Sequence, residues 1–269
     1  MPQIHGQFTL FTREEFKNYL ENTKFTREIT RIQNHHTYIP GYVHYFKDNP
    51  PQPFKWLDSM KRSHLQRGFS DIGQNLTSFP DGTIALCRNF NSTPAAIKGA
   101  NTGSIAIEHL GWFDADQDQM TDEHKETIVF LNAILCKRFH LPPNDQTILY
   151  HHWFDLNTGK RTNGSGSTKT CPGTAFFGGN TVEAANQNFI PLVVQKISNF
   201  TTNTTQAPQP IATGTVTASK LNVRTGAGTS FPVSYSLGKG AQITAYAELD
   251  GWYRIDPQQN AWVSKQFIA

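Results

Sequence analysis

The chain has 269 residues, of which 37% are hydrophobic and 12% aromatic, enough apolar material for a sizeable core and a small second domain. Lys and Arg total 24 against 21 Asp and Glu, which gives a net charge of +3 with neutral histidines. The chain therefore lacks the strong excess of basic residues that is typical of nucleic-acid-binding proteins, and we expect no nucleic-acid partner. No apolar run approaches the roughly 20 residues of a membrane span, so we expect no membrane insertion.

The N-terminal sequence MPQIHG has neither the basic region nor the apolar region of a signal peptide. We therefore expect synthesis in the cytoplasm without a signal peptide. Residues 199–214 (NFTTNTTQAPQPIATG) have the composition of a linker, with much Thr, Asn, Pro and Gln. This linker is expected to separate an N-terminal domain, residues 1–198, from a C-terminal domain, residues 215–269.

Helical and strand patterns alternate along the N-terminal domain. In chain order they predict a helix opened by the capping box of Thr12 and Glu15, a strand over 29–32 running into 34–37, a helix over 56–66, paired strands over 71–79 and 83–88, a strand over 104–110, a helix over 122–139 capped by Thr121, a strand over 146–150, and a last helix from Asn180 that Pro191 kinks or interrupts. Interleaved strands and helices predict an α/β domain with a mixed central sheet flanked by helices.

The C-terminal domain lacks a helical period. Short β segments separated by glycine turns cover residues 220–224, 241–245, 251–254 and 261–263. They predict a second, small all-β barrel.

The three cysteines match no zinc-finger spacing and cannot form a complete disulfide framework. Cys87 and Cys136 lie within strand and helix patterns, so we expect both to be small buried hydrophobic residues. Cys171 differs, because it follows the flexible residues 163–167 in a loop where core packing does not explain a thiol.

Ten histidines are present, and position selects two of them as ligands. His35 and His151 each stand where a predicted strand ends, a place from which a sheet can deliver a side chain to a cleft. Together with Cys171 they form a donor set suited to tetrahedral zinc with a fourth position open for water. Six other histidines have no accompanying signature and are expected in ordinary core or surface roles: His5, His44, His64, His109, His124 and His140.

A zinc-activated water that hydrolyses an amide needs a carboxylate and a cation nearby. Glu108, in the predicted strand over 104–110, is the candidate general base. Lys169, two residues before Cys171, is the candidate cation for the oxyanion that develops on the substrate carbonyl.

An ordered set of motifs now resembles a known family. The motifs are NHHT at 34–37, RGFSDIG at 67–73, DGTI at 81–84, SIAIE at 104–108, His151, and KTCPG at 169–173. Over about residues 29–197 they resemble zinc N-acetylmuramoyl-L-alanine amidases, the group of phage lysozyme-type amidases and peptidoglycan recognition proteins. The resemblance implies zinc binding by His35, His151 and Cys171, with the neighbours His36 and His152 as alternatives if a strand register shifts by one residue.

One position departs from the family pattern. Many members continue Asp-Ile-Gly with a tyrosine that assists catalysis, whereas this chain has Gln74 after Gly73. Glutamine does not titrate usefully, so the resemblance places the acid–base role on Glu108, which matches a catalytic glutamate of some members.

The C-terminal domain is similar to bacterial SH3-like domains at 221–224, at Gly226 and Gly228, at 251–253 and at 262–263. Such domains commonly bind cell-wall peptides or polymers, although Trp252 and Trp262 can also simply fill the barrel.

The expected function is therefore a peptidoglycan hydrolase, an endolysin or autolysin that cleaves the amide between N-acetylmuramic acid and L-alanine and acts at the bacterial cell wall after release. Two alternatives stay open. One is a peptidoglycan receptor without turnover. The other is a Cys-His peptidase with Cys171 as nucleophile and His151 as base.

Overall fold

The computed structural model describes residues 1–205, 209–257 and 259–269. Its internal contacts divide the chain into two compact units, Met1–Ser198 and Asn199–Ala269. Part of the predicted linker has regular structure, because helix α6 (Ile190–Thr205) ends and strand β8 (Ala212–Thr215) begins within residues 199–214, while 206–208 lie outside the described residues. Among the described residues, no helix combines the length and apolarity that crossing a membrane requires.

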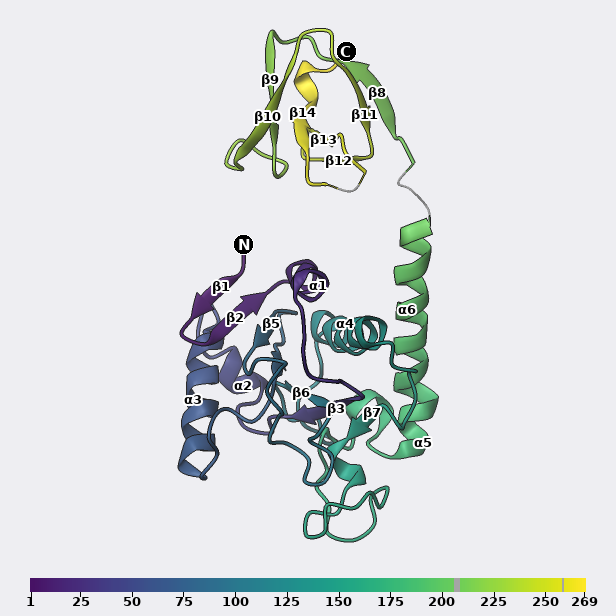
Figure 1. Cartoon of the computed structure of the whole chain (residues 1–269). Helices are drawn as coiled ribbons and strands as arrows, with labels where there is room; N and C mark the ends of the chain where they lie inside the picture. The colour runs from purple at the N-terminus through teal and green to yellow at the C-terminus, as the bar shows by residue number, and fades with distance from the viewer. Residues whose placement is uncertain (206–208, 258) are drawn as a thin grey trace. The chain divides into compact units, whose positions relative to one another are not determined.

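The N-terminal unit is built on a seven-stranded mixed sheet with strand order β1-β2-β5-β4-β6-β3-β7 (Figure 1). The strands are β1 (Gln3–His5), β2 (Phe8–Phe11), β3 (Arg31–His36), β4 (Leu76–Ser78), β5 (Ile84–Leu86), β6 (Ser104–His109) and β7 (Ile148–Tyr150). Neighbours from β4 to β7 are parallel, and β1, β2 and β5 join antiparallel. The predicted fold class is confirmed, with β1 and β2 added at one edge.

The helices of this unit are α1 (Arg13–Asn22), α2 (Tyr42–Tyr45), α3 (Pro53–Gln66), α4 (Asp122–Phe139), α5 (Val182–Ala184) and α6. The predicted capping box is present at α1, where Thr12 accepts from the Glu15 amide and Glu15 accepts from the Thr12 amide. α4 has the predicted bounds and the predicted N-cap, Thr121. Before Pro191, residues Ala185–Phe189 form a turn of π-helix, so the proline follows an irregularity in the helix, as expected of a residue without an amide donor.

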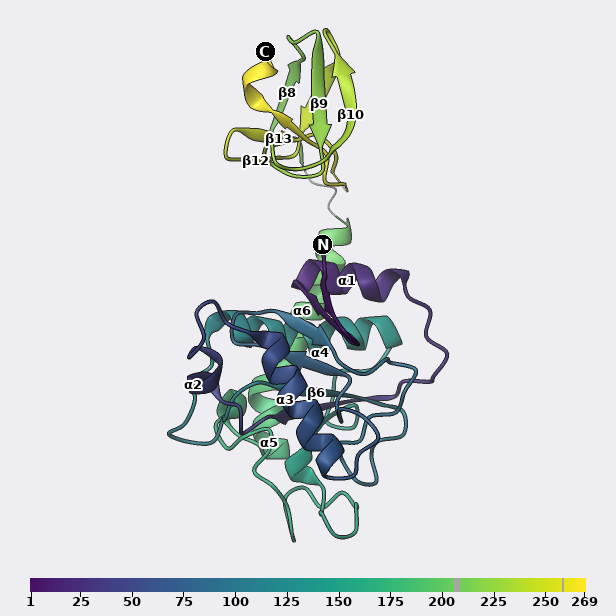
Figure 2. The ribbon, with the colours of Figure 1, turned by 90° about the vertical axis from the view of Figure 1, so that its left-hand side faces the viewer.

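Strand alternation assigns α3 and α4 to opposite faces of the sheet. Helix α3 runs in front of the sheet in the view of Figure 2. His35 on β3 pairs in register with Glu108 on β6, and both side chains line the same cleft as residues of α3. Their sequence neighbours point the other way, because side chains alternate along a strand. Asn34 accordingly exchanges hydrogen bonds with Asn132 of α4, at 2.9 and 3.0 Å.

A chain of buried hydrogen bonds crosses the α4 face of the sheet. Tyr42 Oη lies 2.7 Å from His124 Nδ1, and Ser78 Oγ lies 2.7 Å from both His124 Nε2 and His109 Nδ1. His109 Nε2 is 3.0 Å from Asn34 Oδ1. With both imidazoles neutral, one proton assignment satisfies every link: Tyr42 donates to His124, His124 to Ser78, Ser78 to His109, and His109 to Asn34. We call this set the polar chain.

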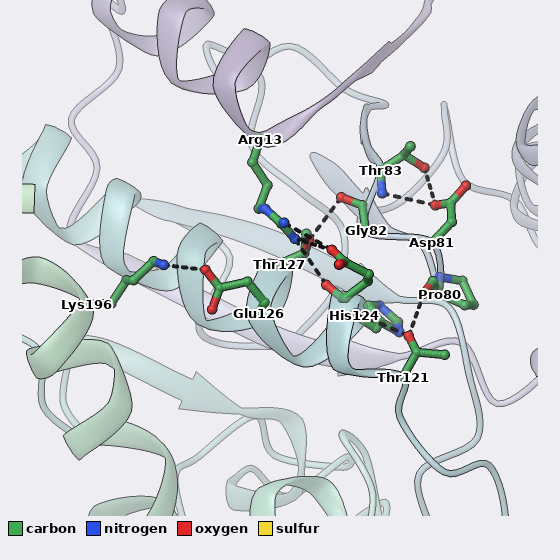
Figure 3. A network of polar contacts seen from close by, with 11 residues as sticks. Arg13, Pro80, Asp81, Gly82, Thr83, Thr121, His124, Glu126, Thr127 and Lys196 are labelled. Carbon is green, nitrogen blue, oxygen red and sulfur yellow. Dashed lines mark hydrogen bonds and ion pairs between the residues drawn. The ribbon is translucent and has the colours of Figure 1, made fainter. Parts of the chain in front are cut away.

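The N-terminal end of α4 is anchored by charge and capping (Figure 3). Arg13 of α1 contacts Glu123 at 3.0 Å and Thr127 Oγ1 at 3.0 Å. Thr127 donates to the carbonyl of Gly82 in the turn between β4 and β5, and Thr121 donates to that of Pro80. Glu126 further along the helix contacts Lys196 of α6. The start of α4 is therefore fixed to α1 and to the β4–β5 turn.

The C-terminal unit has a five-stranded sheet, β10-β9-β14-β13-β12, and a two-stranded sheet, β11-β8. Their strands are β9 (Lys220–Arg224), β10 (Val233–Gly238), β11 (Gln242–Ala245), β12 (Ala247–Leu249), β13 (Trp252–Arg254) and β14 (Trp262–Ser264), with β8 as above. The core is aliphatic, formed by Val216, Leu221, Val223, Ile243, Ala245, Ala261 and Val263. Trp252 and Trp262 are only half-buried and lie outside that buried cluster, so they do not fill the domain interior.

We predict that Ser78→Ala destabilises the N-terminal unit by about 2–6 kcal/mol, because it leaves two buried imidazole nitrogens unpaired at about 1–3 kcal/mol each. Urea unfolding measures the loss. The control is Ser167→Ala, which removes an exposed hydroxyl and should leave the free energy of unfolding within about 0.5 kcal/mol. Equal stabilities of the two variants would show that the polar chain does not stabilise the fold.

Candidate active site

An open cleft of about 620 Å³ lies over the carboxyl ends of β3 and β6. One wall is a face of α3, and another is the segment after β3, residues 37–40. His35, Glu108, His151, Lys169 and Cys171, the residues selected from the sequence, all line it. Five positions spread over 137 residues of chain are thus brought into one cavity by the parallel strands and by the loop that carries Lys169 and Cys171.

Three donor atoms meet in this cleft. His35 Nδ1 lies 3.1 Å from His151 Nδ1 and 3.6 Å from Cys171 Sγ, and the ligand atoms of all three residues lie within 4.8 Å of one another. All three side chains are buried, at 2%, 7% and 6% exposure. This cluster is the only such group of three or more His, Cys, Asp or Glu residues found in the described part of the chain.

The sheet register explains how the two imidazoles meet. Asn34 of β3 pairs with Tyr150, the last residue of β7, so His35 and His151 follow this pair together at the carboxyl ends of the strands. His151 begins a short 3-10 turn (His151–Trp153) rather than extending the strand. Cys171 is held from both sides, because its carbonyl accepts from the His152 amide at 2.7 Å and its Sγ accepts from the His36 amide at 3.4 Å.

The two neighbouring histidines point away from the cluster. His36 Nδ1 accepts a hydrogen bond from the Phe113 amide at 3.2 Å. His152 Nδ1 lies 2.7 Å from the carbonyl oxygen of Lys169 and packs beside Gly164. The rings that face Cys171 are therefore those of His35 and His151, the pair that the strand ends suggest.

Burial sets the protonation of the cluster. It lowers the pKa of His35 well below its usual range and that of His151 to about 3, and nearby Lys169 lowers both further. Both rings are therefore neutral near pH 7 and keep a lone pair for a metal. Burial raises the pKa of the Cys171 thiol, with Glu108 adding to the rise. A thiolate here requires a bound cation, which suits a zinc ligand and not an activated cysteine nucleophile.

Gln33 was not selected from the sequence, although it lies two residues before His35 on the same face of β3. Its Nε2 donates to the Ala100 carbonyl at 2.8 Å, which directs its Oε1 toward His35 Nε2 at 3.4 Å. This arrangement favours the tautomer with the proton on Nε2 and the lone pair on Nδ1, facing the cluster. The signal in the sequence that could have identified Gln33 is its spacing, because residues two apart on a strand share one face.

Glu108 keeps part of its surface exposed in the cleft, and it pairs in register with His35 and with Thr77 of β4. Desolvation raises the pKa of its carboxyl group to about 8, against the opposing effects of Lys169 and then Arg67. Lys169 is exposed at the cleft and makes no ion pair within the described residues. A carboxyl group and a free ammonium therefore flank the cluster.

Gln74 does not line the cleft. It is 1% exposed, and its Nε2 lies 3.0 Å from Thr77 Oγ1 and 3.9 Å from Met60 Sδ. Its Oε1 is buried without a partner among the described residues. Of the six histidines expected in ordinary core or surface roles, His64 lines the cleft from α3 and the other five do not. Cys87 and Cys136 are buried, as expected.

Comparison with known proteins identifies two regions. Residues 25–174 match the model of the family described as N-acetylmuramoyl-L-alanine amidase, and residues 219–269 match that of the bacterial SH3 domain. No curated protein matches the chain.

Solved structures similar to the chain include wild-type PGRP-LB of Drosophila, at 22% identity over 58% of this chain and 81% of that one, with a TM-score of 0.44. They also include the N-acetylmuramoyl-L-alanine amidase LysC of Clostridium intestinale URNW, at 21% identity over 61% of this chain and 87% of that one, with a TM-score of 0.42.

Proposed function

Because the chain belongs to the N-acetylmuramoyl-L-alanine amidase family, with a bacterial SH3 domain at its C-terminal end, we propose that it is a zinc-dependent peptidoglycan amidase. The bond that it cleaves is the amide between the lactoyl group of N-acetylmuramic acid and L-alanine. The observation that carries this proposal is the meeting of His35, His151 and Cys171 in the cleft, with ligand atoms within 4.8 Å of one another.

The donor set fits zinc on its chemistry. Two neutral imidazoles and one thiolate are borderline and soft ligands that leave one tetrahedral position open. His35 Nδ1 and His151 Nδ1 lie 3.1 Å apart, so a cation bound by both rings would replace the proton that can otherwise lie between them. Zinc bound by these residues supplies Lewis acidity and a water of lowered pKa.

Glu108 carries the proton transfers in this proposal. As a carboxylate it accepts a proton from the attacking water, and as a carboxylic acid it returns that proton to the departing amine of L-alanine. A pKa that desolvation raises to about 8 suits both steps, because general catalysis is most effective when the pKa lies near the working pH. No tyrosine is required at position 74, where the buried Gln74 does not reach the cleft.

Lys169 stabilises the negative charge that develops on the substrate carbonyl oxygen. It lines the cleft two residues before Cys171, and its charge lowers the pKa of His35, of His151 and of Glu108. An ammonium without an ion-pair partner at this place is available to the oxyanion.

The C-terminal unit serves as a cell-wall binding domain in this proposal, and the whole chain acts at the bacterial cell wall as an endolysin or autolysin. Trp252 and Trp262 are half-buried rather than enclosed, so part of each ring is available to a ligand. The thiol peptidase alternative is disfavoured, because the pKa values of Cys171 and His151 are shifted away from a thiolate–imidazolium pair.

We predict one tightly bound zinc ion per chain, lost from Cys171→Ser and from His151→Ala because each removes a ligand. Metal analysis after dialysis measures it. His152→Ala is the matched control and should retain the metal, since that ring faces the Lys169 carbonyl. Unchanged metal content in Cys171→Ser and His151→Ala would refute the assignment, and activity that survives chelation would favour a thiol peptidase.

Glu108→Gln and Lys169→Ala should bind zinc and fold as the parent does, yet lose about 10²- to 10⁴-fold in turnover. The readout is release of peptides with N-terminal L-alanine from peptidoglycan. Lys160→Ala is the control for Lys169, because Lys160 is an exposed loop lysine that does not line the cleft. Parental turnover in either active-site variant excludes that residue from catalysis.

A chain that ends at residue 208 should remain a zinc enzyme on small soluble muropeptides and lose activity on intact sacculi. Tethering raises the effective concentration of the catalytic unit at the wall, and truncation removes that gain. Residues 209–269 alone should co-sediment with sacculi. If the truncated chain lyses sacculi as well as the full chain does, and residues 209–269 do not co-sediment with sacculi, then the C-terminal unit does not target the wall.

A further inference from the structure

His152 holds the segment of chain that carries Lys169. Its ring Nδ1 lies 2.7 Å from the Lys169 carbonyl oxygen, and because a carbonyl oxygen only accepts, Nδ1 is the donor. Its backbone amide donates to the carbonyl of Cys171, also at 2.7 Å. One residue therefore binds the chain at two points, at the lysine proposed to stabilise the oxyanion and at the cysteine of the cluster.

The Lys169 backbone has no other hydrogen bond in the described part of the chain. Residues on both sides of it are held by other groups. Before it, the Ser167 amide donates to the Asp155 carboxylate at 3.0 Å. After it, the Thr170 carbonyl accepts from the Asn180 side chain at 2.7 Å. Loss of the imidazole contact therefore releases the backbone of Lys169 while the residues on both sides stay anchored.

The His152 ring is itself fixed by the loop that follows it. Gly164 lies against Nε2, where a side-chain carbon at position 164 would come within 2.5 Å of that atom. Its φ of 98° is in the region that favours glycine, so the loop can close over the ring at this residue. The start of the loop is ordered by Asp155, which accepts from the amides of Asn157 at 3.1 Å and Thr158 at 2.8 Å. The donor is thus in place before a substrate binds.

Position matters for Lys169 because its ammonium ends a long, flexible side chain. The side chain is exposed at the cleft, so packing does not fix it. Its range is set by where the backbone of Lys169 lies. A charge stabilises a developing oxyanion only when it is already near that atom, and a small displacement lowers the rate of the chemical step.

Resting on the catalytic role proposed for Lys169, we propose that His152 is a positioning residue for the reaction. It holds the Lys169 carbonyl so that the ammonium stays close to the substrate carbonyl oxygen, and it takes no part in zinc binding or in proton transfer. The two adjacent histidines then have separate tasks. The His151 ring faces the metal-binding cluster, and the His152 ring faces the backbone of the catalytic cation.

The test uses the full chain with zinc bound and a soluble muramoyl tripeptide. His152→Leu removes the donor and keeps a side chain of similar bulk, whereas His152→Asn keeps an N–H donor at the δ position of the side chain. Both changes are made in the parent and in Lys169→Ala. His5→Ala is the control, because His5 lies in the exposed strand β1 outside the cleft. Metal analysis verifies that every variant carries the parental amount of zinc.

We expect His152→Leu to lower kcat by about 3- to 10-fold and to leave KM within about twofold, as loss of one hydrogen bond that acts through a transition-state contact predicts. His152→Asn should recover kcat to within about twofold of the parent, and His5→Ala should match the parent.

The double variants separate positioning from a general structural role. In Lys169→Ala the change His152→Leu should have no further effect, because the group that it positions is already gone. Three results would each overturn the proposal. They are a parental kcat in His152→Leu, an equal loss in the Lys169→Ala background, and no recovery in His152→Asn.

Failure of the amidase function gives a different result, because the parent itself would then release no peptide. The imidazole contact is then decided by long-range proton–nitrogen NMR of the chain with labelled histidine, in mildly alkaline solution. The His152 signals are assigned by their absence in His152→Asn. A proton on Nδ1 supports the hold on Lys169, since donation to a carbonyl requires it. A proton on Nε2 with none on Nδ1 refutes the proposal, whatever the turnover.

Discussion

The parallel register of β3 against β6 and β7 is the constraint on which the rest of the site depends. It places His35 beside Glu108 on one face and pairs Asn34 with Tyr150, the last residue of β7, so that His35 and His151 follow together. A slip of one residue would put His36 in the place of His35 beside Cys171 and turn His35 toward α4, because strand side chains alternate between faces. The loop that carries Cys171 adds the third ligand atom, Sγ, next to the His35 ring that the strands position.

The polar chain on the opposite face opposes such a slip. Asn34 and His109 are the sequence neighbours of His35 and Glu108, so the hydrogen bonds that they form with α4 and Ser78 fix the register of the residues in the cleft. Apolar side chains at these positions would pack in more than one register, whereas the polar chain is satisfied in one. Buried polar groups stabilise a fold only when each has a hydrogen-bond partner. In the described structure, every member of the polar chain has one.

Local signals predicted much of this architecture. The helix 122–139 was defined by its cap and end charges, and the strand ends at His35 and His151 gave the two imidazoles that face Cys171. The short strand Gln3–His5 is exposed and has no alternating pattern, so the sequence does not reveal it. The role of Gln74 also could not be predicted, because its burial beneath Met60 depends on how α3 packs on the sheet. The positions of Gln33 and Arg67 relative to the cleft could not be predicted either, because they depend on how the strands and α3 come together.

The polar chain makes the stability of the N-terminal unit depend on pH, because its hydrogen bonds require both imidazoles to be neutral. Its two histidines are neutral in the folded unit, where burial holds the pKa of His124 at about 3 and that of His109 well below its usual value, whereas in the unfolded chain each takes up a proton near pH 6.5. The stability that these groups contribute is present above pH 6.5 and is lost progressively as the pH falls toward 3. More than one proton favours unfolding, so acid inactivation should be steep and should coincide with loss of the fold. In acid, the N-terminal unit would thus lose its function because it unfolds.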